Sequence, residues 1–189
     1  MTLKNTLFLF AILIALPVMS QEKSPSETFW ETLKSHCGEA YEGKLVLPEE
    51  DEAFGGKKLV MHLRSCSETE IKIPFYVGDD KSRTWILTMD KGIITLKHDH
   101  RYEDGKEDDI NFYGGTSSNA GKADLQFFPA DVHTQKMIPA AATNVWWITI
   151  GKKTFTYNLK RLGTDRIFKV EMDLTKSIPQ PEAPWGWNN

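Results

Sequence analysis

The sequence predicts an all-β protein: an antiparallel up-and-down barrel of about nine or ten strands with one short N-terminal helix. Apolar and polar residues alternate with a period of two over most of the chain, and short glycine-containing turns separate the alternating segments. A sheet of this size tends to close on itself, because closure removes its exposed edges. A two-sheet β-sandwich is the alternative arrangement of the same strands.

Residues 1–20 have the pattern of a secretory signal peptide: an early lysine, an apolar run from Leu7 to Leu16, and small residues just before Gln21. The apolar run is too short to favour a membrane span. We therefore expect an exported protein, periplasmic or extracellular, with no membrane segment after cleavage. Residues 21–189 are long enough for one domain with its own core, and they end in a proline-rich tail over residues 178–189.

A single helix is predicted after this leader, in the segment SETFWETLKSHCG. Ser26 is placed to cap its first turn. Phe29, Leu33 and Cys37 recur four residues apart and therefore share one helical face. Gly38 can end the helix, because glycine readily adopts the left-handed conformation of a C-terminal cap.

The two cysteines of the chain, Cys37 and Cys66, both lie after the predicted cleavage point. In an exported protein such a pair predicts a disulfide bond. Closing the loop between them would stabilise the fold by about 3–4 kcal/mol on the chain-entropy model. Two reduced, buried thiols are the alternative. The CxxC spacing of thiol oxidoreductases is absent.

Segments with period-two alternation follow in order along the rest of the chain. They are residues 59–64, 71–76, 83–89, 93–103, 106–113, 144–150, 154–161 and 166–174. Turn signals separate them at Lys91-Gly92, Asp104-Gly105, Gly151-Lys152 and Gly163-Thr164-Asp165. Two regions between strands are expected to be loops: the flexible segment that begins at Tyr113-Gly114-Gly115, and the segment around His133, which could close over the barrel mouth.

This order of pieces resembles the layout of calycin barrels, the architecture of lipocalins and fatty-acid-binding proteins. Four motifs resemble those of a family of uncharacterised exported bacterial proteins: SRTWILT at 82–88, KHDHRYEDG at 97–105, YGG at 113–115 and FFPAD, which ends at Asp131. The resemblance covers most of the mature chain. It implies export and a barrel, and it brings no activity or catalytic residues.

The strand predicted at 93–103 carries an unusual density of charged and aromatic residues. Side chains alternate between the two faces of a strand. One face, predicted to point into the barrel, carries Ile94, Leu96, His98, His100 and Tyr102. The other, predicted to face solvent, carries Thr95, Lys97, Asp99, Arg101 and Glu103. The same reasoning places His62 on a solvated face of its own strand.

The flanking turns set the neighbours of these residues. A two-residue turn at Lys91-Gly92 places Trp85 opposite His98 and Arg83 opposite His100; a glycine-bulged turn there would shift this register by one residue. A two-residue turn at Asp104-Gly105 leads into the strand predicted at 106–113. It places Glu107 opposite Tyr102, Asp109 opposite His100 and Asn111 opposite His98. The predicted inward cluster is therefore Arg83, Trp85, His98, His100, Tyr102, Glu107, Asp109 and Asn111.

Buried charged groups must be paired or must hold a ligand, because an isolated charge is costly to bury. One interpretation is a polar plug whose members satisfy one another. A second is a site for a small molecule with an anionic or polar head, gripped by Arg83 over a cavity lined by Trp85. A third is acid–base chemistry, hydrolase- or isomerase-like, with His98 or His100 as base and Asp109 as its orienting carboxylate. The same three residues could instead ligate a divalent metal.

Other classes of function have weaker support in the sequence. The chain has 23 basic and 26 acidic residues and a net charge of −3, and no basic stripe indicates nucleic-acid binding. No sequence motif identifies a cofactor. A structural or interaction module that uses the tail residues Trp185-Gly186-Trp187 is a further hypothesis. A deep cavity beneath Trp85 would favour binding, an exposed His–Asp pair would favour catalysis, and a filled core would favour the structural role.

Overall fold

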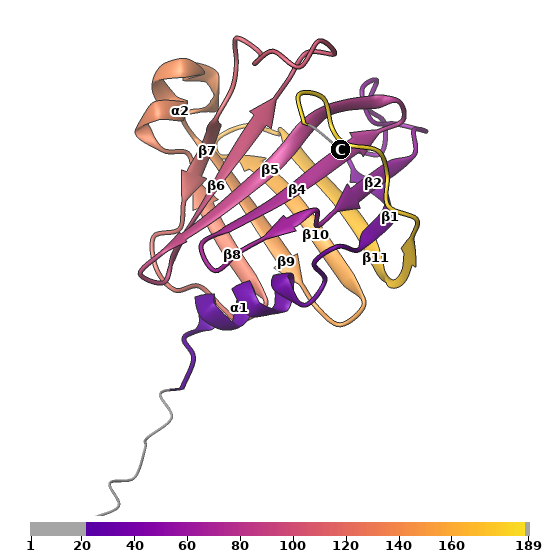
Figure 1. The fold of residues 1–189 in the computed structure, drawn as a ribbon. Coiled ribbons are helices and arrows are strands. Elements are labelled where there is room, and N and C mark those ends of the chain that lie inside the picture. Colours follow the sequence, from indigo (N-terminus) through magenta and orange to yellow (C-terminus); the bar gives the residue numbers. More distant parts are fainter. Residues whose placement is uncertain (1–21, 188–189) are drawn as a thin grey trace, which may run out of the picture.

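The computed structural model of the protein describes residues 22–187 (Figure 1). The predicted signal peptide, residues 1–20, lies outside the described residues, as do residues 188–189 of the predicted tail. Within the described part of the chain, no helix is long and apolar enough to cross a membrane.

The helices are α1 (Pro25–Lys34), α2 (Val132–Met137) and a 3₁₀ turn at Pro139–Ala141. The first strands are β1 (Ala40–Leu47), β2 (Leu59–His62), β3 (Ser65–Cys66), β4 (Glu70–Val77), β5 (Asp80–Asp90) and β6 (Ile93–His100). They are followed by β7 (Tyr113–Thr116), β8 (Leu125–Pro129), β9 (Asn144–Ile150), β10 (Thr154–Arg161) and β11 (Ile167–Ile178).

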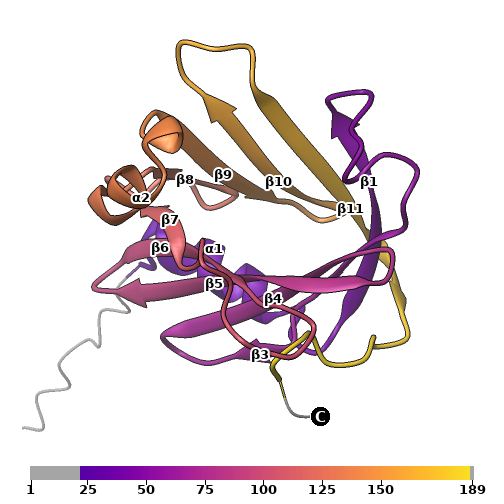
Figure 2. The ribbon, with the colours of Figure 1, turned by 90° about the horizontal axis from the view of Figure 1, so that it is seen from above.

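The strands form one antiparallel, nearly closed barrel (Figure 2), as the sequence predicts. Their order around the barrel is β7-β6-β5-β4-β2-β1-β11-β10-β9-β8, and the short β3 pairs with β4. The first strand, β1, therefore pairs with the last, β11, and the sheet ends lie between β7 and β8. The two-sheet sandwich is excluded, because hydrogen bonding is continuous from β7 round to β8.

The seam between β7 and β8 is narrow because glycines line it. Gly115 bridges to Ala130, and the hydroxyl of the buried Thr134 both accepts a bond from the Gly114 N–H and donates one to its carbonyl oxygen. A Cβ atom on Gly115 would overlap the backbone carbonyl of Pro129. Residues Tyr113–Thr116 thus form a strand of the seam, so the prediction of a loop is wrong for these residues; the chain is irregular only after Thr116.

We expect Gly115→Ala to destabilise the fold, because the added methyl meets backbone atoms that cannot rotate away. Overpacking of this kind costs about 1–3 kcal/mol. Gly151→Ala is the matched control: its Cβ would have no neighbour closer than 3.9 Å. Urea unfolding of both variants measures the effect. Equal free energies of unfolding for Gly115→Ala and Gly151→Ala would contradict this account of the seam.

The helix α1 closes one end of the barrel, lying beneath the ring of strands in the view from above (Figure 2). Phe29, Trp30 and Leu33 point into the core and are at most 2% exposed. The helix begins earlier than predicted, because the side chain of Ser24, and not that of Ser26, accepts the bond from the Glu27 N–H. It ends at Lys34, so Cys37 lies in the following turn.

The predicted disulfide between Cys37 and Cys66 is present. It joins the turn after α1 to β3, across a sequence separation of 29 residues. The bond therefore links the helix that closes the barrel end to the sheet above it.

The C-terminal segment after β11 lies along the outside of the barrel, across β2 and β4 (Figure 1). The hydroxyl of Tyr76 donates to the Glu182 carbonyl oxygen at 2.8 Å, and the Trp185 N–H donates to the Lys81 carbonyl oxygen at 3.1 Å. The backbone of residues 179–187 is irregular, as suits the proline-rich composition of this segment. This segment converts part of the outer face of the barrel into buried surface.

Candidate functional site

A cavity of about 340 Å³ occupies the barrel interior at the end opposite α1. Four of the predicted site residues line it: Arg83, Trp85, His98 and His100. The two-residue turn predicted at Lys91-Gly92 is present, and it pairs Arg83 with His100 and Trp85 with His98. The inward orientation of both histidines is therefore confirmed.

Aromatic rings form one wall of the cavity. Trp85 stacks on Phe75 with ring centroids 4.7 Å apart and planes 17° apart, and on Tyr157 with values of 4.3 Å and 13°. Phe54 continues the stack beyond Phe75, at 6.3 Å and 21°. Offset parallel stacking is a favoured geometry for aromatic pairs. These four rings therefore make a rigid, ordered wall.

His98 is neutral and fixed in one tautomer. Its Nδ1 lies 3.0 Å from the Tyr113 carbonyl oxygen, which can only accept, so Nδ1 carries the proton. Its Nε2 then accepts a bond from the Tyr157 hydroxyl at 2.6 Å. Burial lowers the pKa of His98 to about 3, and the same cause raises the pKa of Tyr157 well above its ordinary value. Both side chains are thus uncharged at neutral pH.

His100 lies nearer the cavity mouth. Its Nε2 is 3.0 Å from the Tyr113 hydroxyl, and burial together with the charge of Arg83 lowers its pKa. Burial raises the pKa of Tyr113 to about 12. The pair is consequently neutral at pH 7, and its protons can be shared or donated to a bound molecule.

Positive charge gathers at the mouth of the cavity. Three arginines line it, Arg83, Arg161 and Arg166, together with one carboxylate, Asp108. Arg83 pairs with Asp80. Within residues 22–187, neither Arg161 nor Arg166 forms an ion pair with a carboxylate; Arg161 donates from Nε to the Asn144 side-chain oxygen at 2.9 Å.

The predicted strand at 106–113 is wrong, and with it the register that places Asp109 opposite His100. The turn after Tyr102 has three residues and ends in Gly105 at a φ of 83°, so the Tyr102 N–H donates to the Lys106 carbonyl oxygen. Regular pairing with β6 is interrupted by a bulge at residues 108–112 and resumes at β7, with Tyr113 opposite His98.

This bulge separates the other predicted site residues from the cavity. Tyr102, Glu107 and Asp109 are exposed and do not line it. Asn111 is buried beside it: its side-chain oxygen accepts the His100 N–H at 2.7 Å, and its Nδ2 has no partner within the described chain. Among residues 22–187, no three histidine, cysteine or carboxylate groups are arranged to hold a metal ion, so the hypothesis that His98, His100 and Asp109 form a metal site is wrong.

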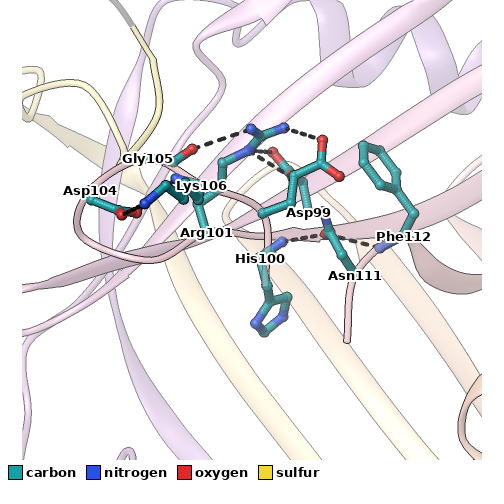
Figure 3. A network of polar contacts seen from close by, with 9 residues as sticks. Asp99, His100, Arg101, Asp104, Gly105, Lys106, Asn111 and Phe112 are labelled. Carbon is teal, nitrogen blue, oxygen red and sulfur yellow. Dashed lines mark hydrogen bonds and ion pairs between the residues drawn. The ribbon is translucent and has the colours of Figure 1, made fainter. Parts of the chain in front are cut away.

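The prediction that Asp99 and Arg101 face solvent is also wrong. Asp99 is 3% exposed, and both of its oxygens lie 3.1 Å from Arg101 Nε. Figure 3 shows this network on one side of the strand and the His100 ring on the other. Arg101 also contacts Glu107 at 3.3 Å, and Gly186 of the C-terminal segment packs against it.

We expect Asp99→Ala to lower the free energy of unfolding by about 1–3 kcal/mol, because it removes the buried carboxylate that accepts the Arg101 Nε–H and leaves that donor without its partner. Asp109→Ala is the matched control: this carboxylate is exposed, and surface changes usually lie within about 0.5 kcal/mol. Urea melts of both variants test the difference. An Asp99→Ala variant as stable as Asp109→Ala would show that the buried pair contributes nothing.

The remaining histidines fall elsewhere. His62 is 2% exposed and not solvated as predicted, because the outer face of β2 near it packs against Ile178 of the final strand. His133 is exposed and belongs to α2, a helix that the sequence did not predict. Neither residue lines the cavity.

Several lining residues were missed. Tyr113 lies on β7, beside β6, and its place depends on the turn whose length was mispredicted. The others come from β9, β10, β11 and the turn before β11, on the far side of the barrel: Asn144, Trp146, Tyr157, Arg161, Arg166 and Phe168. Strand parity could have found part of this set. Phe155, Tyr157, Leu159 and Arg161 alternate along β10, so the apolar inward face of that strand ends at an arginine.

Comparison of the chain with protein-family models, with curated proteins and with solved structures gives no match. The likeness to calycin barrels therefore remains one of layout, which the nearly closed antiparallel barrel fits.

Proposed function

We propose that this protein binds a small molecule with an anionic head in the barrel cavity, with Arg161 and Arg166 as the main contacts for the head. The observation that carries the proposal is the positive charge on the cavity lining: Arg161 and Arg166 have no carboxylate partner within residues 22–187, whereas Arg83 is paired with Asp80, and Asp108 is the one carboxylate among the lining residues. Both cavity histidines have lowered pKa values and add no charge at neutral pH.

The two arginines lie at either end of one turn, with the Arg161 N–H donating to the Arg166 carbonyl oxygen. Both side chains line the same cavity, so their like charges repel each other, and a bound anion offsets that repulsion. The bond to Asn144 occupies Nε of Arg161 and leaves both terminal amino groups for a ligand. A guanidinium in this arrangement can hold a carboxylate or phosphate through two parallel hydrogen bonds.

The cavity also favours binding over the alternatives raised by the sequence. A filled barrel would support a purely structural role, whereas Trp85 forms the wall of an open space. The catalytic hypothesis names Asp109 as the orienting carboxylate, but Asp109 is exposed and does not line the cavity. Asp108 does line it, and within residues 22–187 its side chain accepts bonds from the Tyr102 hydroxyl and the Ile110 N–H rather than from a histidine ring. The tail residues proposed as a contact for other proteins pack against the barrel itself, with Lys72 Nζ 5.4 Å from the Trp187 ring centroid.

Export is part of the same proposal. It is supported by the leader-like residues 1–20 and by the Cys37–Cys66 bond, which is favoured in an oxidising compartment. Mass spectrometry of the intact protein should give the mass of a chain that starts near Gln21, lower by two hydrogens than the mass of the reduced chain. A mass that includes the leader would contradict it.

Native mass spectrometry of protein purified from its own cell envelope tests the binding function. We expect the wild-type chain to retain a small anion and the double variant Arg161→Gln/Arg166→Gln to lose it. The double variant Lys152→Gln/Lys153→Gln removes the same charge from the exposed turn before β10, at the far end of that strand, and should retain the anion. Equal retention by both double variants, or a wild-type chain with nothing bound, would contradict the proposal.

A further inference from the structure

The residues that line the interior of the cavity indicate the chemical class of the ligand body, which the arginines at the mouth do not. Of the 19 residues that line the cavity, nine carry rings and four are aliphatic. The nine are Phe54, Phe75, Trp85, His98, His100, Tyr113, Trp146, Tyr157 and Phe168. A long alkyl chain is accommodated by any apolar lining, whereas a ring gains additional energy only from other rings in defined orientations.

The orientations here are defined. The stack of Phe54, Phe75, Trp85 and Tyr157 keeps successive planes within about 21° of one another. A second group of rings adjoins this stack, in which Tyr113 and Trp146 are 6.1 Å apart with planes at 41°. His98 joins this group, stacked on Tyr113 at 4.6 Å and 10°.

Hydrogen bonds hold several of these rings in place without a ligand. His98 bonds to both the Tyr113 carbonyl oxygen and the Tyr157 hydroxyl, and the Tyr113 hydroxyl bonds to His100. The ring positions therefore require little ordering when a molecule enters, and such preorganisation favours a rigid ligand over a flexible one.

The volume of about 340 Å³ lies at the low end of the range for small-molecule sites, roughly 300–1,000 Å³. It suits one or two fused rings. The cationic mouth lies on the rim of the same cavity, so a rigid molecule can reach the arginines and the rings together.

We infer that the ligand is a small planar aromatic anion, an aryl carboxylate or a close equivalent, whose ring system lies among the aromatic side chains and whose charged group meets Arg161 and Arg166. This inference rests on the proposed function and adds the chemical class of the ligand body. Phe54 is the residue best suited to test it, because it lies at the partly exposed end of the stack and Arg83 sits 5.4 Å from its ring centroid.

Isothermal titration calorimetry on the oxidised mature protein, with three probes matched in heavy-atom count, tests the aromatic body of the ligand and its anionic head separately. The probes are 2-naphthoate, an aryl anion; undecanoate, an alkyl anion; and 2-naphthamide, a neutral aryl compound. We expect 2-naphthoate to bind about tenfold more tightly than either of the others, since aromatic contacts and a charged hydrogen bond each contribute on that order.

The variant Phe54→Leu keeps an apolar side chain and removes a ring. It should weaken 2-naphthoate several-fold and leave undecanoate unchanged. Undecanoate that binds wild type as tightly as 2-naphthoate would overturn the aromatic inference and leave the proposed anion site intact. Equal binding of 2-naphthamide would overturn the anionic head, and absence of binding by all three probes would count against the proposed function itself.

Discussion

Acidification from pH 7 to pH 4 is expected to destabilise the protein by about 3 kcal/mol through His98 alone. The buried ring has a pKa of about 3 in the folded chain, against an ordinary value of 6.5. Between these two values the unfolded chain binds a proton that the folded chain does not. The free energy of unfolding therefore falls as the pH falls below 6.5, by up to about 1.4 kcal/mol per pH unit.

Other histidines act in the same direction. Burial lowers the pKa values of His36, His62 and His100 as well. The carboxylates Asp80 and Asp131 have lowered pKa values, so their contribution is lost only at more acidic pH, below the ordinary value of 3.8. The window between pH 6.5 and pH 4 thus reports mainly on buried histidines.

Urea unfolding at several pH values, on wild type and on His98→Gln, measures this effect. The variant should show a much shallower loss of stability between pH 6.5 and pH 4. His133→Gln, which replaces an exposed histidine, should follow the wild-type curve. If His98→Gln and wild type have the same slope in this window, His98 is not the neutral, buried group described here.

The second large effect is expected for Trp85→Ala, which should lower the free energy of unfolding by about 3–5 kcal/mol. Trp85 is 3% exposed and has ring partners on both sides, Phe75 and Tyr157. Its removal enlarges the cavity and leaves both neighbours without their stacking contact. Because Trp85 already borders a cavity, few neighbouring side chains can move into the space that it leaves.

Phe127→Ala provides the comparison, since Phe127 is 47% exposed on the outer side of β8. Its loss should cost less than about 1 kcal/mol. Thermal and urea unfolding of the two variants give the difference. A Trp85→Ala variant within about 1 kcal/mol of wild type would mean that the aromatic wall does not support the barrel.

The parts of the site that could be predicted depend on local rules. Alternation along β6 places His98 and His100 on one face, and the two-residue turn at Lys91-Gly92 fixes their partners on β5. That turn has φ values of 48° and 79°, which suit a tight hairpin and leave a single register.

The parts of the site that were predicted wrongly depend on the length of one turn or on segments that are distant in the sequence. One extra residue in the turn at Gly105 changes every pairing beyond it, and the bulge at 108–112 then moves Asp109 away from the histidines. Asp99 obeys its predicted parity and points outward. It is nonetheless buried, because the hairpin loop and the C-terminal segment cover that outer face.

The charged mouth illustrates a third limit. Arg161 and Arg166 belong to a hairpin far along the chain from Arg83, and nothing local indicates that the barrel brings them to one cavity. Closure through β1 and β11 sets that proximity. Strand parity along β10, and along β11 extended back to Arg166, places both arginines on the inward face, but the cavity that they share with Arg83 follows only from closure.

A crystal structure of the protein soaked with 6-bromo-2-naphthoate tests the central claim most directly, because anomalous scattering locates the bromine independently of the rest of the density. We expect one bromine peak inside the barrel, among Phe75, Trp85 and Trp146, with the carboxylate within hydrogen-bond distance of Arg161 or Arg166. A bromine found only on the outer surface, or a barrel interior that stays empty at saturating probe, would contradict the claim.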